Sequence, residues 1–96
     1  MSLNNYYVYI TTNPGKKVLY TGVTNELRSR VAGHRENKGD KRTFAGRYYC
    51  YNLIYYEHFP DIKLAIQREK EIKNMSRKKK EELITTMNPK WNFLRV

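Results

Sequence analysis

Two segments near the N-terminus are rich in β-branched and aromatic residues, at residues 6–11 (YYVYIT) and 18–21 (VLYT). This composition is typical of β-strands. The intervening "NPGK" suits a reverse turn with Pro14 at its second position and Gly15 at its third. The pattern therefore predicts that the chain begins with a β-hairpin.

The expected register of this hairpin brings two tyrosines together. A symmetric turn over residues 13–16 would place Tyr9 directly opposite Tyr20, with both phenols on one face of the sheet. However, a type II turn at Pro-Gly is not the favoured hairpin turn, and a bulge of one residue would send the phenols to opposite faces.

A helix is expected after the hairpin, over residues 25–37, with Thr24 as its capping residue. At about 100° per residue, one face of this helix carries apolar and basic side chains together. These are Leu27, Arg30, Val31 and His34. Arg30 and His34 are therefore predicted to stand in or beside the packing face.

The run "YNLIYYE" at residues 51–57 predicts a third strand, and Asp61 can cap the helix that follows it. One face of that helix is apolar at Ile62, Ala65, Ile66 and Ile72, but Glu69 falls in the middle of this stripe. The second helix thus also carries a charged residue on its packing side.

Ser76 can cap a last helix through "RKKKEELITTM", and the chain ends in an irregular tail in which Trp91 is expected to pack inward. The predicted order is strand, strand, helix, strand, helix, helix. This order predicts an α+β fold in one domain spanning residues 1–96.

The charge indicates the kind of partner. The chain has 19 Lys and Arg against 9 Asp and Glu, a formal charge of +10 over 96 residues. A polyanion, and nucleic acid before a membrane surface, is the expected partner. Without an apolar run of about 20 residues or a secretory signal, the sequence predicts a cytoplasmic protein. Cys50 is the single cysteine, so we expect a packed thiol.

Arg30 and Glu69 are costly to bury unless they are paired, coordinated or solvated. One explanation is a structural ion pair that joins the two helices, with His34 satisfied or exposed and the tyrosines serving as packing residues. The other is that Tyr9, Tyr20, Arg30, His34 and Glu69 converge as a phosphodiesterase site.

Such a group has the chemistry for hydrolysis of a phosphodiester. The carboxylate of Glu69 could hold one Mg²⁺ or Mn²⁺, with water and phosphate oxygens completing the coordination. Arg30 could brace the phosphate through its fork of donors. A tyrosine could accept the proton of the attacking water, if nearby positive charge lowers its pKa from the ordinary value near 10.

At these positions the sequence resembles the GIY-YIG nuclease family, in particular its small stand-alone bacterial members. The segment "YVY" (Tyr7 to Tyr9) stands where the family has Gly-Ile-Tyr, and "YTG" (Tyr20 to Gly22) where it has Tyr-Ile-Gly. The resemblance continues through "GVTNELRSRVAGH" and "AIQREKEIK" to "NPKWN", and so covers nearly the whole chain.

The resemblance implies roles for individual residues. Arg30 matches the family's catalytic arginine, His34 the His or Tyr one turn later, Glu69 the metal-binding glutamate and Asn92 the asparagine that supports the site. The general base is one of the two motif tyrosines, which we assign to Tyr9, while Tyr20 positions water or the metal shell.

The family also implies a small three-stranded antiparallel sheet flanked by helices. Its activity is hydrolysis of DNA with one divalent metal, and a role in DNA repair or recombination is expected. Gly22 belongs to the supporting residues of the motif.

The alternative function is a non-catalytic basic module that binds nucleic acid, DNA or RNA, through exposed tyrosines and basic residues. For either function, the residues predicted to contact nucleic acid are Arg28, Lys41, Arg42, Arg47, Lys78, Lys79 and Lys80. The alternative interpretation of "RKKK" at residues 77–80 is that it forms only the solvated first turn of the last helix. A protein-interaction domain with a decayed site is a third alternative, and a protein partner could supply specificity.

Overall fold

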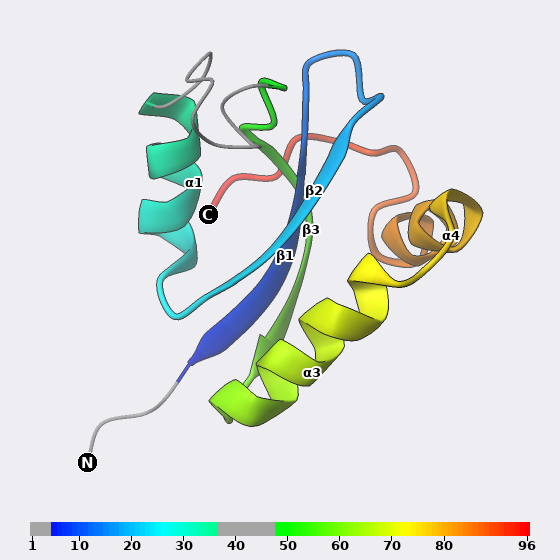
Figure 1. The fold of residues 1–96 in the computed structure, drawn as a ribbon. Helices are drawn as coiled ribbons and strands as arrows, with labels where there is room; N and C mark the ends of the chain where they lie inside the picture. The colour runs from blue at the N-terminus through cyan, green and yellow to red at the C-terminus, as the bar shows by residue number, and fades with distance from the viewer. Residues whose placement is uncertain (1–4, 37–47) are drawn as a thin grey trace.

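The computed structural model describes residues 5–36 and 48–96 (Figure 1). The elements follow the predicted order and form an α+β fold. They are β1 (Tyr6–Thr12), β2 (Leu19–Thr24), α1 (Leu27–Glu36), β3 (Asn52–Phe59), α3 (Ile62–Lys73) and α4 (Arg77–Met87).

The three strands form an antiparallel sheet in the order β2-β1-β3, with β1 in the centre. In the hairpin, Tyr9 pairs with Gly22 and Thr11 with Tyr20. The predicted pairing of Tyr9 directly opposite Tyr20 is therefore wrong by two residues. Because side chains alternate with a period of two, this shift keeps both tyrosines on one face, as diagonal neighbours.

The loop of the hairpin explains the shift, because it is longer than a symmetric four-residue turn. The carbonyl of Asn13 accepts from Lys16 N at 2.9 Å, and the Asn13 side chain accepts from Lys17 N at 2.8 Å and Val18 N at 2.9 Å. Lys16, not Gly15, adopts the left-handed conformation (φ 59°). The side chain of Asn13 thus holds the chain until Leu19, where pairing resumes.

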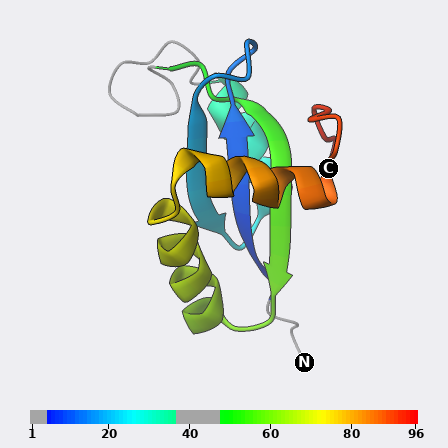
Figure 2. The same cartoon turned by 90° about the vertical axis from the view of Figure 1, so that its right-hand side faces the viewer.

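The helices cover both faces of the sheet. On one face, Val8, Ile10 and Ile54 pack with α3 and α4 through Ala65, Ile72 and Ile84. On the other, Tyr9 and Leu53 pack with Leu27 and Val31 of α1. Figure 1 shows α1 on the opposite side of the strands from α3 and α4, and Figure 2 shows α4 crossing the sheet. The edge strand β2 lies between α1 and α3.

The predicted caps of the last two helices are confirmed. Asp61 accepts from Lys63 N at 2.8 Å, and Ser76 accepts from Lys79 N at 3.2 Å. Thr24 is the last residue of β2, and its hydroxyl accepts from Glu26 N at 3.1 Å just before α1. Asp61 and Ser76 thus fix where α3 and α4 begin. The prediction that Thr24 caps α1 is wrong, because the helix begins at Leu27 and its first hydrogen bond is accepted by Glu26 O.

The C-terminal tail crosses from the face of α3 and α4 to the face of α1. Trp91 is half-buried against the first of these faces and donates to Thr85 Oγ1 at 3.1 Å. Leu94 donates its N–H to Leu53 O at 2.7 Å and packs near Tyr9 and Val31. The tail ends beside α1 (Figure 1). It therefore ties the two faces together.

Cys50 is completely buried, as predicted, and burial raises the pKa of its thiol to about 11. Within the described residues, no helix is both long enough and apolar enough to cross a membrane.

Candidate active site

The two motif tyrosines meet at the edge of the sheet formed by β2. Tyr9 reaches across from the central strand, and its ring lies 6.3 Å from that of Tyr20 between centroids, at 47°. Only 1% of Tyr9 is exposed, whereas Tyr20 is half-buried. The phenols were expected on one face, and the structure brings them together there.

Gly22 makes room for this arrangement. A Cβ placed on Gly22 would lie 2.6 Å from Cζ of Tyr9, far inside contact distance, and closer still to the hydroxyl. Because Gly22 has no side chain, the Tyr9 ring can lie directly over the β2 backbone. The glycine of the "YTG" motif thus has a steric role next to the phenol.

Several groups act on the Tyr9 phenol. Burial raises its pKa well above the ordinary value, and the neighbouring Tyr20, a hydrogen bond with Tyr20 and the charge of Glu69 raise the pKa further. The charge of Arg30 lowers the pKa. The phenol therefore lies within electrostatic reach of a residue on α1 and a residue on α3, on both sides of the sheet edge.

Arg30 is exposed, while its helix neighbours Leu27 and Val31 are buried. Arg30 therefore stands beside the packing face, which among the described side chains of α1 is formed by Leu27 and Val31. An exposed guanidinium keeps its water and pays little desolvation. It also remains accessible to a phosphate.

Glu69 is partly buried, with a side-chain exposure of 16%. Its carboxylate forms an ion pair with Lys73 Nζ at 3.5 Å, one turn along the same helix. The predicted apolar stripe is narrower than expected, since Ala65 and Ile72 are buried but Ile66 is 38% exposed. The structural alternative of a Glu69–Arg30 pair is thus replaced by a pair within α3.

The oxygen atoms of the Glu69 carboxylate are ligands of the kind that hard divalent cations prefer. In the structure its partner is the ammonium of Lys73. Among the described residues, no group of three or more His, Cys, Asp and Glu is suited to hold a metal. A metal at Glu69 would therefore have one protein carboxylate, with water and phosphate oxygens as its other ligands.

Other predicted residues fall in different regions. The side chain of His34, near the end of α1, lies outside the described residues, as do Lys41, Arg42 and Arg47. Arg28 is exposed on α1, Lys78 and Lys79 are exposed on α4, and Lys80 is half-buried there.

The tail contains a buried polar residue, Asn88, whose role was not predicted from the sequence. Asn88 is 5% exposed, and its side-chain amide donates to Ile54 O at 2.9 Å and Asn92 O at 2.8 Å while it accepts from Asn92 N at 3.0 Å. Asn92, predicted to support the site, is exposed and is joined to Asn88 through its backbone. Pro89 could have indicated this role, because a proline disfavours helical conformation in the residue before it and so predicts that α4 ends at Asn88.

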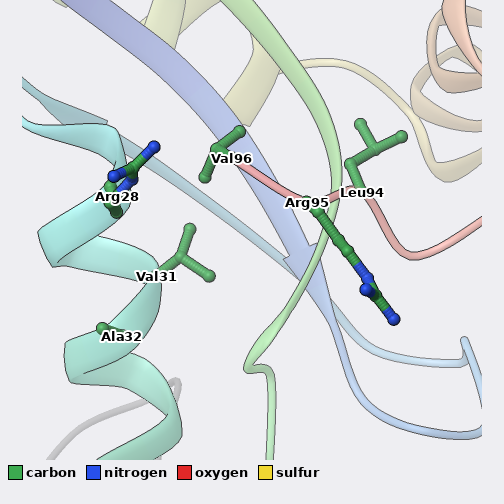
Figure 3. Close-up of a pocket in the computed structure, with 6 residues that line it drawn as sticks. All are labelled: Arg28, Val31, Ala32, Leu94, Arg95 and Val96. Carbon is green, nitrogen blue, oxygen red and sulfur yellow. The ribbon is translucent and has the colours of Figure 1, made fainter.

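A groove separates α1 from the tail on the face of Tyr9. It is lined by Arg28, Val31, Ala32, Leu94, Arg95 and Val96. Figure 3 shows Val31 pointing toward the tail, with Arg28 on the helix and Arg95 directed away from it. This groove presents basic side chains beside apolar ones.

The sequence can now be compared with known proteins. The GIY-YIG catalytic domain matches residues 5–82, which include Tyr9, Tyr20, Arg30 and Glu69. The chain therefore belongs to the GIY-YIG family, a nuclease superfamily.

Its relatives include small proteins of the UPF0213 group. It is 41% identical to a UPF0213 protein of Natronomonas pharaonis over 80 residues, which cover 83% of this chain and 91% of that protein. It is 37% identical to the UPF0213 protein YazA of Bacillus subtilis over 81 residues, covering 84% and 79% of the two chains.

The fold also matches a solved structure. A UPF0213 protein of Bacillus halodurans, determined by solution NMR, is 34% identical and has a TM-score of 0.58. The match covers 91% of this chain and 89% of that one. The three-stranded antiparallel sheet with its helices is therefore shared with this protein.

Proposed function

We propose that the protein is an endonuclease that hydrolyses DNA phosphodiester bonds with one divalent metal ion. One observation carries the proposal: Arg30 from α1 and Glu69 from α3 both act electrostatically on the Tyr9 phenol, next to Tyr20. These are the residue types that phosphodiester hydrolysis requires.

Glu69 would hold Mg²⁺ or Mn²⁺ in place of the Lys73 ammonium. Bound there, the ion would supply positive charge to stabilise the developing charge of the phosphate and leaving group. Lys73 would then be free to take another anionic partner. The choice between the two ions is part of the proposal and rests on the preference of hard cations for oxygen ligands.

Tyr9 would accept the proton of the attacking water, and Tyr20 would position the water and hold the Tyr9 hydroxyl in place. The raised pKa of Tyr9 opposes this role because it keeps the phenol protonated. The positive charge of Arg30 lowers the pKa and so favours the role. Further positive charge at Glu69 would lower the pKa of Tyr9 again. Arg30 would also brace the scissile phosphate with its guanidinium.

The remaining roles are proposed on the family resemblance. His34 would lie one turn beyond Arg30 and assist at the phosphate, and Asn92 would support the site through the tail. Gly22 would keep the space for Tyr9. We place this activity inside the cell, in DNA repair or recombination. A protein partner would supply specificity.

The test is a nicking assay on plasmid and branched DNA with Mg²⁺ or Mn²⁺. Glu69→Ala and Arg30→Ala should each abolish cleavage and leave DNA affinity largely intact, because neither removes the basic surface. Lys70→Ala, an exposed position on α3, is the matched control. Cleavage by both site variants at the wild-type rate would refute the proposal.

A second candidate is a nucleic-acid-binding module without catalysis. The observation in its favour is that the buried Tyr9 phenol is held in its protonated form. This function predicts salt-sensitive binding that depends on Lys78, Lys79 and Lys80 but not on Glu69. Metal-dependent turnover that disappears in Glu69→Ala would exclude it.

A further inference from the structure

A groove of about 330 Å³ runs along the edge of β2 on the side of α3 and α4. Its lining residues are Leu19, Tyr20, Thr21, Lys73 and Lys80. The two lysines come from different helices, and the five lining residues include no carboxylate. The groove therefore has a strand edge as its floor and two ammonium groups at its side.

We propose that this groove binds the backbone phosphate of DNA next to the one that is cleaved, with Lys73 and Lys80 as its two contacts. This inference rests on the proposed function. Lysine ammonium groups neutralise phosphates without reading bases, so the groove would position the strand and carry no sequence preference.

Two contacts connect the groove to the candidate active site. Tyr20 lines the groove, and its ring is also tilted against that of Tyr9. Lys73 lines the groove and also pairs with Glu69 at 3.5 Å. A strand that passes Tyr9 and Tyr20 would therefore bring an adjacent phosphate within reach of Lys73.

The Lys73–Glu69 contact explains how one lysine can serve two states. The side chain of Lys73 is 52% exposed, whereas that of Glu69 is 16% exposed. The ammonium therefore lies at the solvent side of the pair, where it can turn toward a phosphate in the groove. The contact of Lys73 with a phosphate does not require a metal ion at Glu69, so it should be present in EDTA.

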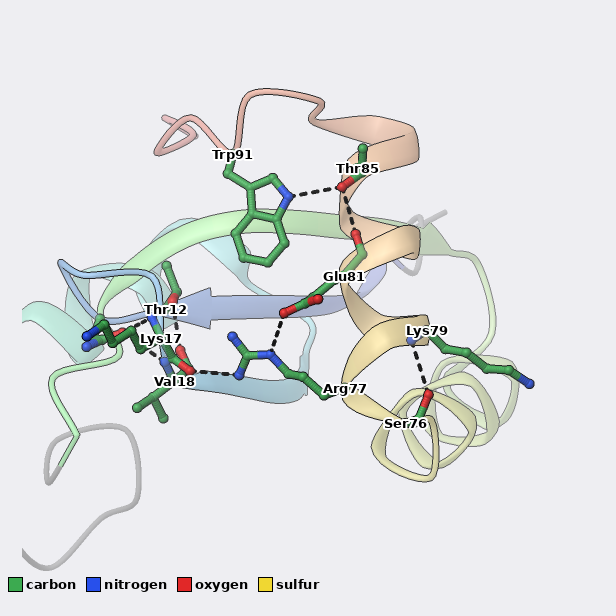
Figure 4. Close-up of polar contacts among 10 residues, drawn as sticks. Thr12, Lys17, Val18, Ser76, Arg77, Lys79, Glu81, Thr85 and Trp91 are labelled. Atoms are coloured by element: carbon green, nitrogen blue, oxygen red, sulfur yellow. Dashed lines mark hydrogen bonds and ion pairs between the residues drawn. The ribbon is translucent and has the colours of Figure 1, made fainter.

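The position of Lys80 is fixed by its helix. Arg77, the first residue of α4, donates to Lys17 O at 2.7 Å and pairs with Glu81 at 2.9 Å, which fastens α4 to the loop before β2 (Figure 4). Figure 4 shows Lys79 pointing away from the strands. Lys80, unlike Lys79, therefore lines the groove.

The experiment measures binding of a labelled branched DNA oligonucleotide by anisotropy, with EDTA present, over a range of NaCl concentrations. Lys73→Met and Lys80→Met should each reduce the slope of log K against log[salt] by about 0.9, the loss of one phosphate contact. Lys70→Met, which removes one exposed charge from α3 outside the groove, should leave the slope nearly unchanged.

Two further variants test whether charge is the cause. Lys73→Arg and Lys80→Arg should restore the slope, which a loss of folding would not predict. Equal slopes for groove and control variants would overturn the inference. This result is distinguishable from failure of the proposed function, which is decided by metal-dependent cleavage in Glu69→Ala and not by binding.

Discussion

At the scale of single residues, the proposed chemistry depends on Tyr9. The phenol is 1% exposed, and burial is the largest cause of its raised pKa. An unperturbed tyrosine is ionised to about one part in a thousand at pH 7, and this one is ionised less. A base that is mostly protonated makes the rate of reaction depend steeply on pH.

The first prediction concerns that dependence. Because the pKa of Tyr9 is raised, the ionised fraction should increase about tenfold for each pH unit below the pKa. Single-turnover cleavage with saturating Mg²⁺ should therefore rise with a slope near one between about pH 6 and pH 9. Tyr9→Phe should abolish cleavage and its dependence on pH. A plateau below pH 7 in the wild-type protein would contradict the assignment of Tyr9 as the base.

The second prediction concerns the space over Gly22. In Gly22→Ala, the new Cβ would meet Cζ of Tyr9 at 2.6 Å, so the buried ring must move. We expect a loss of about 1–3 kcal/mol in the free energy of unfolding, together with loss of cleavage. Chemical denaturation followed by fluorescence measures the first effect.

Gly15→Ala is the matched control. The nearest atom to a Cβ at Gly15 is Asn13 Nδ2 at 3.8 Å, an ordinary contact distance. This variant should retain both stability and activity. Equal stability of Gly22→Ala and Gly15→Ala would show that the close approach of Tyr9 is not required.

At the scale of elements, two side-chain amides organise the loop and the tail. Asn13 holds the hairpin loop through the N–H groups of Lys17 and Val18. Asn88 holds the tail against β3 through Ile54 O and Asn92. Neither role depends on hydrophobic periodicity.

The third prediction follows from Asn88. In Asn88→Ala, the buried carbonyl of Ile54 loses its donor, and the tail loses its bonds at Asn92. An unsatisfied buried group costs about 1–3 kcal/mol. Thermal unfolding should show a correspondingly lower Tm.

Asn92→Ala is the comparison, because the bonds that Asn92 makes with Asn88 use its backbone. Its stability should change by no more than about 0.5 kcal/mol. A loss of cleavage in this variant without loss of stability would support the role that family resemblance assigns to Asn92. A larger loss of stability than in Asn88→Ala would contradict the description of the tail.

These elements also show how much of the fold could be predicted from the sequence. The order of strands and helices and the caps at Asp61 and Ser76 were predicted correctly, because periodicity and capping are local properties. The hairpin register was wrong, because the hydrogen bonds of the Asn13 side chain decide it. Asn88 was missed, because its partners on β3 are distant in the sequence.

The candidate site shows the same division. The alternation along the strands placed Tyr9 and Tyr20 on one face despite the error in register. The pairing of Glu69 with Lys73 and the exposure of Arg30 were not predicted. Both depend on how α1 and α3 are rotated against the sheet, and the periodicity of the sequence does not determine this rotation.

At the scale of the whole molecule, the residues of the proposed site lie around the edge strand β2. α1 brings Arg30 to one side of this edge, and α3 brings Glu69 to the other, while the sheet supplies the two tyrosines. The formal charge of +10 attracts a polyanion to this small surface. The central claim is that residues from three elements act as one site.

The most direct measurement of that claim is a double-mutant cycle on single-turnover DNA cleavage with Mg²⁺, comparing Tyr9→Phe, Glu69→Gln and the double variant. Groups that act as a unit give non-additive losses. We predict that the wild-type protein cleaves, that each single variant loses nearly all of this activity, and that the double variant is no slower than the slower single variant. Independent losses that multiply in the double variant, or undiminished cleavage by Glu69→Gln, would contradict the account.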